Sequence, residues 1–154
     1  MKTAEEMLNE KSLGMITVPK DATVNEAIKV MNENKIGAIL VKDGEDIVGI
    51  WTERDLLRNA LDDNFDRKTA LIGDYMTTGL KSAQHNETLY QLQDKFLGMR
   101  LRHLMIEKDG KYVGMISTGD VMKTVLNEKE KELKQLNAMT SWEYYDNWRW
   151  SKKK

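Results

Sequence analysis

The sequence predicts an α+β fold in which one strand-helix-strand-strand-helix unit occurs twice. The motif Gly-apolar-x-Thr/Ser-x-x-Asp occupies residues 49–55 and recurs 65 positions later at 114–120. Short apolar runs typical of strands alternate with segments whose apolar residues have helical spacing. Their order is the same in both halves, with no gap between Thr23/Thr88 and Asp55/Asp120. A period this long, present twice, indicates a tandem domain rather than a solenoid.

Length and composition exclude several classes of protein. The chain has 154 residues, a net charge of −1 and no cysteine. Its length suits one domain or two small halves that share a core. The charge provides no field for nucleic acid or an anionic membrane, and the lack of cysteine excludes disulfides and thiolate chemistry. With no signal segment and no long apolar window, we expect a cytoplasmic protein without nucleic-acid or membrane partners.

The first half begins after a short helix at 3–10, where Thr3 and Glu6 form a capping-box pattern. A short strand at 15–18 is expected to stop at Pro19. Thr23 then caps a helix that runs to about Asn34, with one apolar face. The remaining expected elements are a buried strand at 36–41, a turn at 42–46, a return strand at 47–51, a helix at 55–61 and a linker at 62–69.

The second half repeats this order. Leu89, Leu92 and Phe96 form the buried face of a helix capped by Thr88. The other expected elements are strands at 79–83, 101–106 and 112–116 and a helix at 120–126, which residues 127–137 extend as a solvated helix. We therefore divide the chain into a first repeat at 8–62, a second at 70–126 and a C-terminal extension at 127–154. Because a unit of about 60 residues buries little surface alone, we expect the repeats to pack about a pseudo-twofold axis.

The duplicated motif resembles that of the cystathionine-β-synthase (CBS) domain. The strands at 36–41 and 101–106 and the helix openings at 21–24 and 86–89 add to the resemblance, which covers roughly residues 8–126. A tandem pair of this kind is called a Bateman module. The resemblance implies a regulatory, signal-transducing module that binds AMP, ADP, ATP, NAD or S-adenosylmethionine. It also implies a disc-shaped homodimer.

Two interpretations apply to Thr52-x-x-Asp55 and Ser117-x-x-Asp120. In the first, hydroxyl and carboxylate only cap a helix N-terminus. In the second, the hydroxyl donates to a phosphate at that terminus and the aspartate accepts from the hydroxyls of a ribose. The residues alone leave both interpretations open, and the resemblance favours a nucleotide site in a cleft between the repeats.

The resemblance also implies a place for the adenine, between the short first strand and the middle strand of each half. Core packing is the alternative for the apolar members of this set, and solvated surface charge is the alternative for the cations proposed near the phosphates. His103 is a satisfied hydrogen-bonding residue or a ligand contact, whereas His85, in a polar loop, indicates no function. The residues implicated beside the adenine or the phosphates are Thr17, Val18, Gly37, Ala38, Ile39 and Arg54 in the first half and Lys81, Ser82, Ala83, Arg102, His103 and Leu104 in the second.

The sequence contains no P-loop, nucleophile elbow or metal-spaced cluster, so we expect neither catalysis nor a metal site nor a catalytic cofactor. The alternative to a nucleotide sensor is a ligand-free structural or protein-interaction dimerisation module. A third possibility is a module that binds S-adenosylmethionine or a metal–ATP complex. Residues 142–150 hold five aromatic side chains. We expect this tail to pack on its own module or a dimer mate, or to dock on an unknown protein partner.

Overall fold

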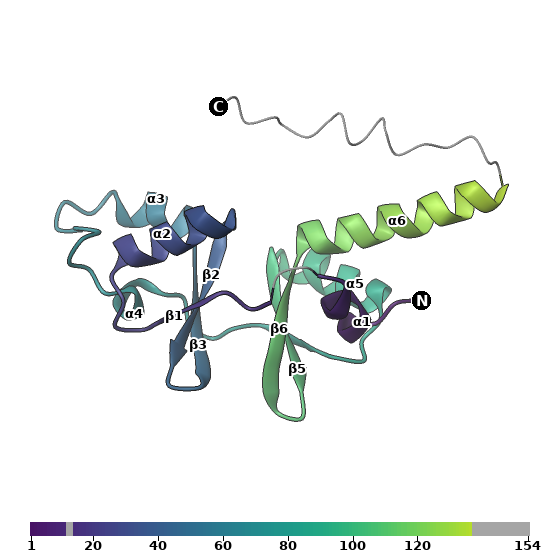
Figure 1. Cartoon of the computed structure of the whole chain (residues 1–154), viewed down its shortest axis with the longest axis horizontal. Helices are drawn as coiled ribbons and strands as arrows, with labels where there is room; N and C mark the ends of the chain where they lie inside the picture. Colours follow the sequence, from purple (N-terminus) through teal and green to yellow (C-terminus); the bar gives the residue numbers. More distant parts are fainter. Residues whose placement is uncertain (12–13, 137–154) are drawn as a thin grey trace. The chain divides into compact units, whose positions relative to one another are not determined.

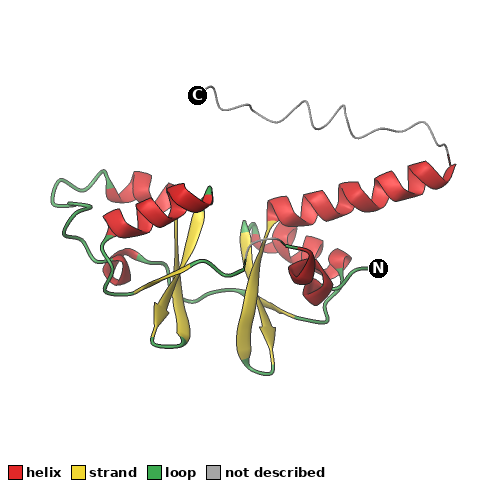
Figure 2. Cartoon of the chain, in the orientation of Figure 1, coloured by secondary structure: helices red, strands yellow, loops and turns green. Residues whose placement is uncertain are grey.

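The computed structural model describes residues 1–11 and 14–136, and Figures 1 and 2 show its helices and its two three-stranded sheets. In each sheet the short first strand runs parallel to the central strand, and the third strand is antiparallel to it. The predicted fold class, two β-α-β-β-α repeats with a C-terminal helix, is confirmed. The strands are β1 (Thr17–Pro19), β2 (Ala38–Asp43), β3 (Asp46–Thr52), β4 (Ser82–Gln84), β5 (His103–Lys108) and β6 (Lys111–Ser117).

Six helices complete the described part of the chain, and three of them begin at a predicted threonine cap. Thr3, Thr23 and Thr88 each accept a bond from the third helical N–H, while the Glu or Gln at that position bonds back to the cap N–H. The helices are α1 (Ala4–Glu10), α2 (Val24–Asn34), α3 (Glu53–Asn59), α4 (Ile72–Tyr75), α5 (Leu89–Met99) and α6 (Thr118–Leu136).

The chain forms two compact units, Met1–Thr118 and Gly119–Lys154. Within the second unit, α6 carries ion pairs between Lys129 and Glu132 and between Lys134 and Glu130. Leu133 is about half exposed. The predicted extension of the last helix is therefore confirmed as far as Leu136. The aromatic segment 142–150 lies outside the described residues.

The 65-residue repeat extends to backbone detail that the sequence pattern did not reveal. Thr17 pairs with Leu40 as Ser82 pairs with Met105, and both hairpins shift register at the same place. Lys35 and Arg100, which end α2 and α5, both adopt the left-handed conformation that is uncommon outside glycine. Buried core positions also match in pairs: Val18/Ala83, Val24/Leu89, Ala27/Leu92, Met31/Phe96, Ile39/Leu104, Val41/Ile106 and Trp51/Ile116.

Each half is completed by the segment that leads into the other half. Helix α1, which precedes the first repeat, lies against β6 of the second (Figure 1). Helix α4, at the start of the second repeat, contributes the fully buried Ile72 to the core of the first. The two leading segments make equivalent backbone hydrogen bonds: Ala4 N to Glu87 O, Glu5 N to His85 O and Leu89 N to Lys2 O on one side, and Ile72 N to Ala22 O, Gly73 N to Lys20 O and Val24 N to Ala70 O on the other.

The packing of each leading segment against the other half explains why the repeated motif contains a glycine. A Cβ atom at Gly114 would lie 2.7 Å from a methyl carbon of Leu8, just after the middle of α1. A Cβ atom at Gly49 would lie 2.7 Å from Cγ of Met76, directly after α4. Both distances are shorter than van der Waals contact. Glycine is therefore needed in β3 and β6 because a side chain from the other leading segment lies directly on the strand.

Several boundary predictions differ from the structure. Pro19 is the last residue of β1 rather than its stop, which is possible because β1 is an edge strand. The helix predicted from Asp55 begins at Glu53, because Thr52 is its cap. The segment predicted as a linker packs against the first half: Phe65 stacks edge-on against Tyr75 of α4, with ring centroids 5.1 Å apart. Helix α4 was not predicted.

We predict that Gly49→Ala lowers the free energy of unfolding by about 1–3 kcal/mol, because the new methyl group must displace Met76 from a packed contact. Urea denaturation followed by circular dichroism measures this change. Gly98→Ala is the matched control, since a Cβ atom added at Gly98 in α5 would meet nothing within 4 Å. That variant should gain about 0.5–1 kcal/mol from helix propensity. Equal effects of the two substitutions would contradict the packing explanation.

Charged side chains reinforce the contact between α1 and the second half. Glu5 forms an ion pair with Lys108 of β5, and its Oε2 lies 3.2 Å from His85 Nδ1. The hydrogen bond from Lys108 and then the one from His85 hold the pKa of Glu5 below its usual value. The bond to Glu5 correspondingly raises the pKa of Lys108. His85, to which the sequence assigned no role, thus helps to hold α1 in place.

We predict that this contact weakens in acid. A carboxylate with a lowered pKa in the folded state contributes stability above its unfolded pKa and loses it as the pH falls through the folded value. The stability difference between wild type and Glu5→Gln should therefore be largest near neutral pH and shrink between about pH 5 and about pH 3. Denaturation midpoints measured across this range test the prediction, with Glu33→Gln, at an exposed position of α2, as control. A constant difference would contradict it.

Candidate functional site

The first candidate site lies where β3 ends and α3 begins. Thr52, the last residue of β3, lies opposite Ala38, the first residue of β2. The Thr52 hydroxyl accepts from the Asp55 N–H at 3.3 Å and donates to Asp55 Oδ2 at 3.1 Å. The Thr52 N–H donates to the same carboxylate oxygen at 2.9 Å. Thr52 and Asp55 therefore form a complete capping box, as the first interpretation expects.

The other carboxylate oxygen of Asp55 is less engaged. Asp55 Oδ1 lies 3.7 Å from Nη1 of Arg58, whose side chain is largely exposed. An exposed ion pair at this distance contributes little stability. Arg54, the cation predicted for the first half, is exposed on the first turn of α3. The capping box thus leaves one oxygen of Asp55 and the guanidinium of Arg54 for a further hydrogen-bonding partner.

Glu53, which the sequence pattern did not single out, lies directly over Gly37. The Glu53 N–H donates to the Gly37 carbonyl at 3.0 Å. A Cβ atom at Gly37 would lie 3.3 Å from the Glu53 carboxyl carbon. The Glu53 carboxylate thus stands beside the residue that leads into β2, on the first turn of α3.

The second half has the same backbone arrangement with different side chains. Ser117 ends β6 opposite His103, and the Thr118 N–H donates to the Arg102 carbonyl at 2.9 Å. The Thr118 hydroxyl donates to the Leu101 and Arg102 carbonyls, each at 3.3 Å. Arg102 and Lys81 are exposed. Asp120 lies in the first turn of α6.

The residues predicted beside the adenine divide between the two faces of each sheet. Val18 and Ile39 belong to the hydrophobic core cluster of the first half, together with Trp51. Successive residues of a strand point to opposite faces, so Thr17 and Ala38 face away from this cluster. The equivalent residues Ala83 and Leu104 are also buried. The side chains of these four apolar residues, Val18, Ile39, Ala83 and Leu104, therefore pack in the protein interior, which leaves their backbone groups as the means of contacting a ligand.

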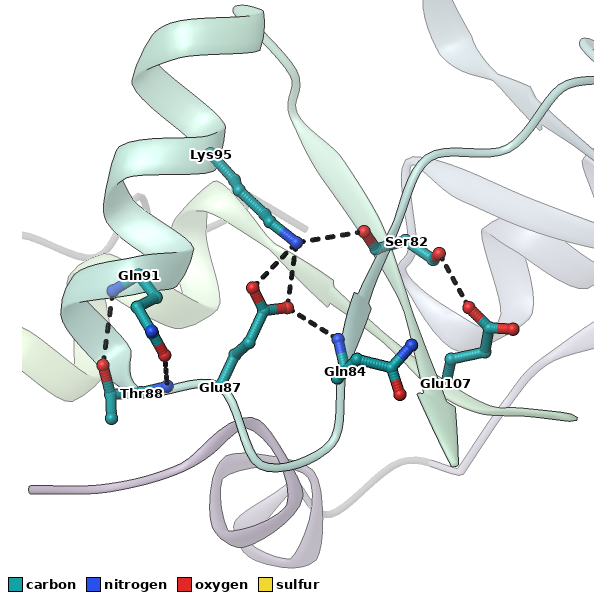
Figure 3. A network of polar contacts seen from close by, with 7 residues as sticks. All are labelled: Ser82, Gln84, Glu87, Thr88, Gln91, Lys95 and Glu107. Carbon is teal, nitrogen blue, oxygen red and sulfur yellow. Dashed lines mark hydrogen bonds and ion pairs between the residues drawn. The ribbon is translucent and has the colours of Figure 1, made fainter. Parts of the chain in front are cut away.

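A polar network surrounds Ser82 in the second half (Figure 3). The Ser82 hydroxyl donates to Glu107 at 3.0 Å. Lys95 donates to Glu87 and, at 3.5 Å, to the Ser82 carbonyl. The Glu87 carboxylate also accepts from the Gln84 N–H at 2.6 Å. The network links β4 to Lys95 of α5 and to Glu107 of β5.

The sequence pattern did not point to Glu53, Glu107 or Lys95. The positions 65 residues away hold Thr118, Lys42 and Val30. A comparison of the charges at equivalent positions in the two halves could have found these residues. Among residues 1–11 and 14–136, no group of three His, Cys, Asp or Glu side chains has a geometry suited to a metal ion. Nor does any described helix have the length and apolarity needed to cross a membrane.

Comparison with known proteins identifies the family. A model of the CBS domain matches the chain twice, at residues 11–62 and 72–127. The chain belongs to the CBS domain family. It is 36% identical over 123 residues to the mitochondrial CBS domain-containing protein CBSX3 of Arabidopsis thaliana, a match that covers 77% of this chain and 60% of the relative. The chain thus spans less than two thirds of that protein.

Solved CBS structures share the fold. A CBS-domain protein from Burkholderia ambifaria is 34% identical, with a TM-score of 0.75 over 82% of this chain and 95% of its own. Two further structures, solved in complex with AMP, are CBSX2 and a CBS domain protein from Pyrobaculum aerophilum. They are 21% and 19% identical, and each has a TM-score of 0.69 over 82% of this chain and 98% and 97%, respectively, of its own. At this identity the likeness shows the fold alone.

We predict that Thr52→Ala lowers the free energy of unfolding by about 1 kcal/mol, because the Asp55 N–H loses its acceptor at the start of α3. Thermal and urea denaturation measure the loss. Thr78→Ala, at an exposed loop position, is the control and should stay within about 0.5 kcal/mol of wild type. A wild-type stability for Thr52→Ala would show that the capping box contributes nothing.

Proposed function

We propose that this CBS pair is a regulatory module that binds an adenosine nucleotide. The observation that supports the proposal is the duplicated placement of a hydroxyl opposite the first residue of a central strand. Thr52 lies opposite Ala38, and Ser117 lies opposite His103. In both halves an aspartate follows the hydroxyl by three residues, at Asp55 and Asp120. The AMP complexes of two proteins with this fold agree with the same class of ligand.

The proposed contacts follow from the chemistry of a nucleotide. The hydroxyls of Thr52 and Ser117 donate to phosphate, and the carboxylates of Asp55 and Asp120 accept from ribose hydroxyls. Arg54, Lys81 and Arg102, which are exposed, are the cations proposed to meet the phosphates. AMP, ADP, ATP and NAD all present these groups. Binding regulates a protein partner only if the ligand prefers one arrangement of the module to another. We propose a non-catalytic homodimer for this role.

One observation favours the second candidate, a ligand-free structural or interaction module. Thr52 and Asp55 already satisfy each other through three hydrogen bonds in the first half. A capping box of this kind needs no ligand to explain it. The two candidates differ in whether changing the aspartates affects binding or only stability.

We predict saturable, sub-millimolar binding of at least one adenosine nucleotide to purified protein stripped of bound nucleotide with charcoal. Isothermal titration with AMP, ADP, ATP and NAD measures the affinities, and their rank order identifies the ligand. The double variant Asp55→Asn/Asp120→Asn should bind at least about tenfold more weakly, because each amide replaces a charged acceptor of the ribose hydroxyls.

Asp63→Asn provides the control, since Asp63 is an exposed acid between the repeats. It should bind as wild type does. If none of the four nucleotides produces heat near millimolar concentration, the module binds no adenosine nucleotide and the structural role stands. Binding that the double variant leaves unchanged would place the ligand away from the two aspartates.

A further inference from the structure

The outer face of α5 is apolar, whereas the equivalent face of α2 is polar. Tyr90 and Leu97 are seven residues apart, which places them two turns apart on the same side of α5. They are 59% and 78% exposed, respectively. The positions 65 residues earlier, in α2, hold Asn25 and Asn32. The repeated fold therefore accepts polar side chains at these positions, and packing within the chain does not explain the apolar ones.

The two helix faces also differ in how the chain itself covers them. Asn25 of α2 accepts a hydrogen bond from Arg67 Nε at 3.2 Å, so the segment between the repeats bonds to the start of α2. Beside Leu97 of α5 there is open space, since a Cβ atom at Gly98 would meet nothing within 4 Å. Single exposed apolar residues are common on protein surfaces. The charges on either side of Leu97 indicate what covers this one.

These charges are complementary to their own copies in a second chain. Asp94 lies three residues before Leu97 and Arg100 three residues after it, and both charged residues are exposed. A twofold axis through Leu97 places Asp94 of each chain opposite Arg100 of the other. Lys95, the other charged residue of α5, is paired with Glu87 at 2.8 Å within the chain. Two antiparallel α5 helices thus form an apolar centre with an ion pair on each side, the usual arrangement of an interface.

The same arrangement is unfavourable for α2. The positions equivalent to Asp94 and Arg100 hold Lys29 and Lys35, both exposed. A twofold axis between two α2 helices would therefore place lysine opposite lysine on both sides. Glu33 would add a carboxylate next to this axis. Because like charges that face each other across an interface destabilise it, self-association is favoured for α5 and disfavoured for α2.

We propose that two copies of this chain associate through antiparallel α5 helices, with Leu97 on the twofold axis. Each Leu97 packs against its own copy, and each Asp94 pairs with the partner's Arg100. A stable interface buries roughly 1,200–2,000 Å² in total, so the α5 pair is the centre of the interface and the surrounding surface completes it. This inference rests on the homodimer of the proposed function and is independent of nucleotide binding.

The test is sedimentation velocity of the full chain over a range of concentrations. The wild type should form a dimer. Leu97→Asn gives α5 the residue that α2 has at the equivalent position, and it should weaken dimerisation by about tenfold or more because the apolar contact on the axis is lost. Lys29→Asp, at the exposed position of α2 equivalent to Asp94, is the control and should dimerise as the wild type does.

Charge reversal tests the twofold register. Asp94→Lys faces the partner's Arg100 with a like charge, and Arg100→Asp does the same to the partner's Asp94. Aspartate suits the left-handed conformation of Arg100. Because two ion pairs become two repulsive pairs, each variant should dimerise about tenfold more weakly than the wild type.

An equimolar mixture of the two charge variants should regain an affinity close to that of the wild type. In the mixed dimer the introduced lysine faces the introduced aspartate, and the native Asp94 faces the native Arg100. Pairing within one chain would produce no such rescue. Circular dichroism of each variant verifies that the fold is retained.

Three outcomes would overturn the inference while leaving the homodimer in place. They are wild-type dimerisation of Leu97→Asn or of either charge variant, a mixture that dimerises no better than its components, and a loss for Lys29→Asp equal to that for Asp94→Lys. A wild type that stays monomeric at high micromolar concentration would overturn the homodimer and the inference together. Nucleotide binding is measured separately by the titration described above, so its failure is distinguishable from both.

Discussion

Each half of this protein depends on a segment that belongs, in sequence, to the other half. The dependence is physical, because the buried backbone of each half needs hydrogen-bonding partners that its own repeat does not supply. The Ala22 and Glu87 carbonyls accept from N–H groups at the starts of α4 and α1. Ile72 is completely buried in the core of the first half, and Leu8 lies on Gly114 of the second. Neither repeat is therefore complete as a continuous stretch of chain.

The parts of the fold that the sequence predicts are those fixed by local chemistry. Thr3, Thr23 and Thr88 cap helices because a hydroxyl with a Glu or Gln three residues later satisfies two terminal N–H groups within one turn. The central strands are identifiable because they are short, apolar and repeated. Helix α4 was missed because its four residues have no periodicity of their own, and they form a helix through contacts with the first half. The role of His85 was missed for the same reason, since Glu5 lies 80 residues away.

The residues of the candidate site also divide into those that the sequence identifies and those that it does not. Thr52 and Asp55 could be identified because the motif that contains them is repeated. Glu53 and Glu107 could not, because their importance lies in how they differ from Thr118 and Lys42 at equivalent positions. A duplication keeps the residues that the backbone needs, such as Gly49 and Gly114, in both copies. Side chains that the backbone does not need are able to differ between the copies, as Glu53 and Thr118 do.

In β3, the residue that packs against a leading segment and the residue of the candidate site are only three positions apart. Gly49 lies under Met76, which follows the leading segment of the second repeat, and Thr52 caps α3 three residues later. The same spacing separates Gly114, under Leu8, from Ser117. A ligand that bonds to the hydroxyl must compete with, or add to, the capping hydrogen bonds at the end of this strand. A ligand that shifts this strand therefore also shifts the contact between the strand and the leading segment. Because the leading segments join the two halves, a ligand that prefers one arrangement of the strand at either hydroxyl also biases the contact with the other half.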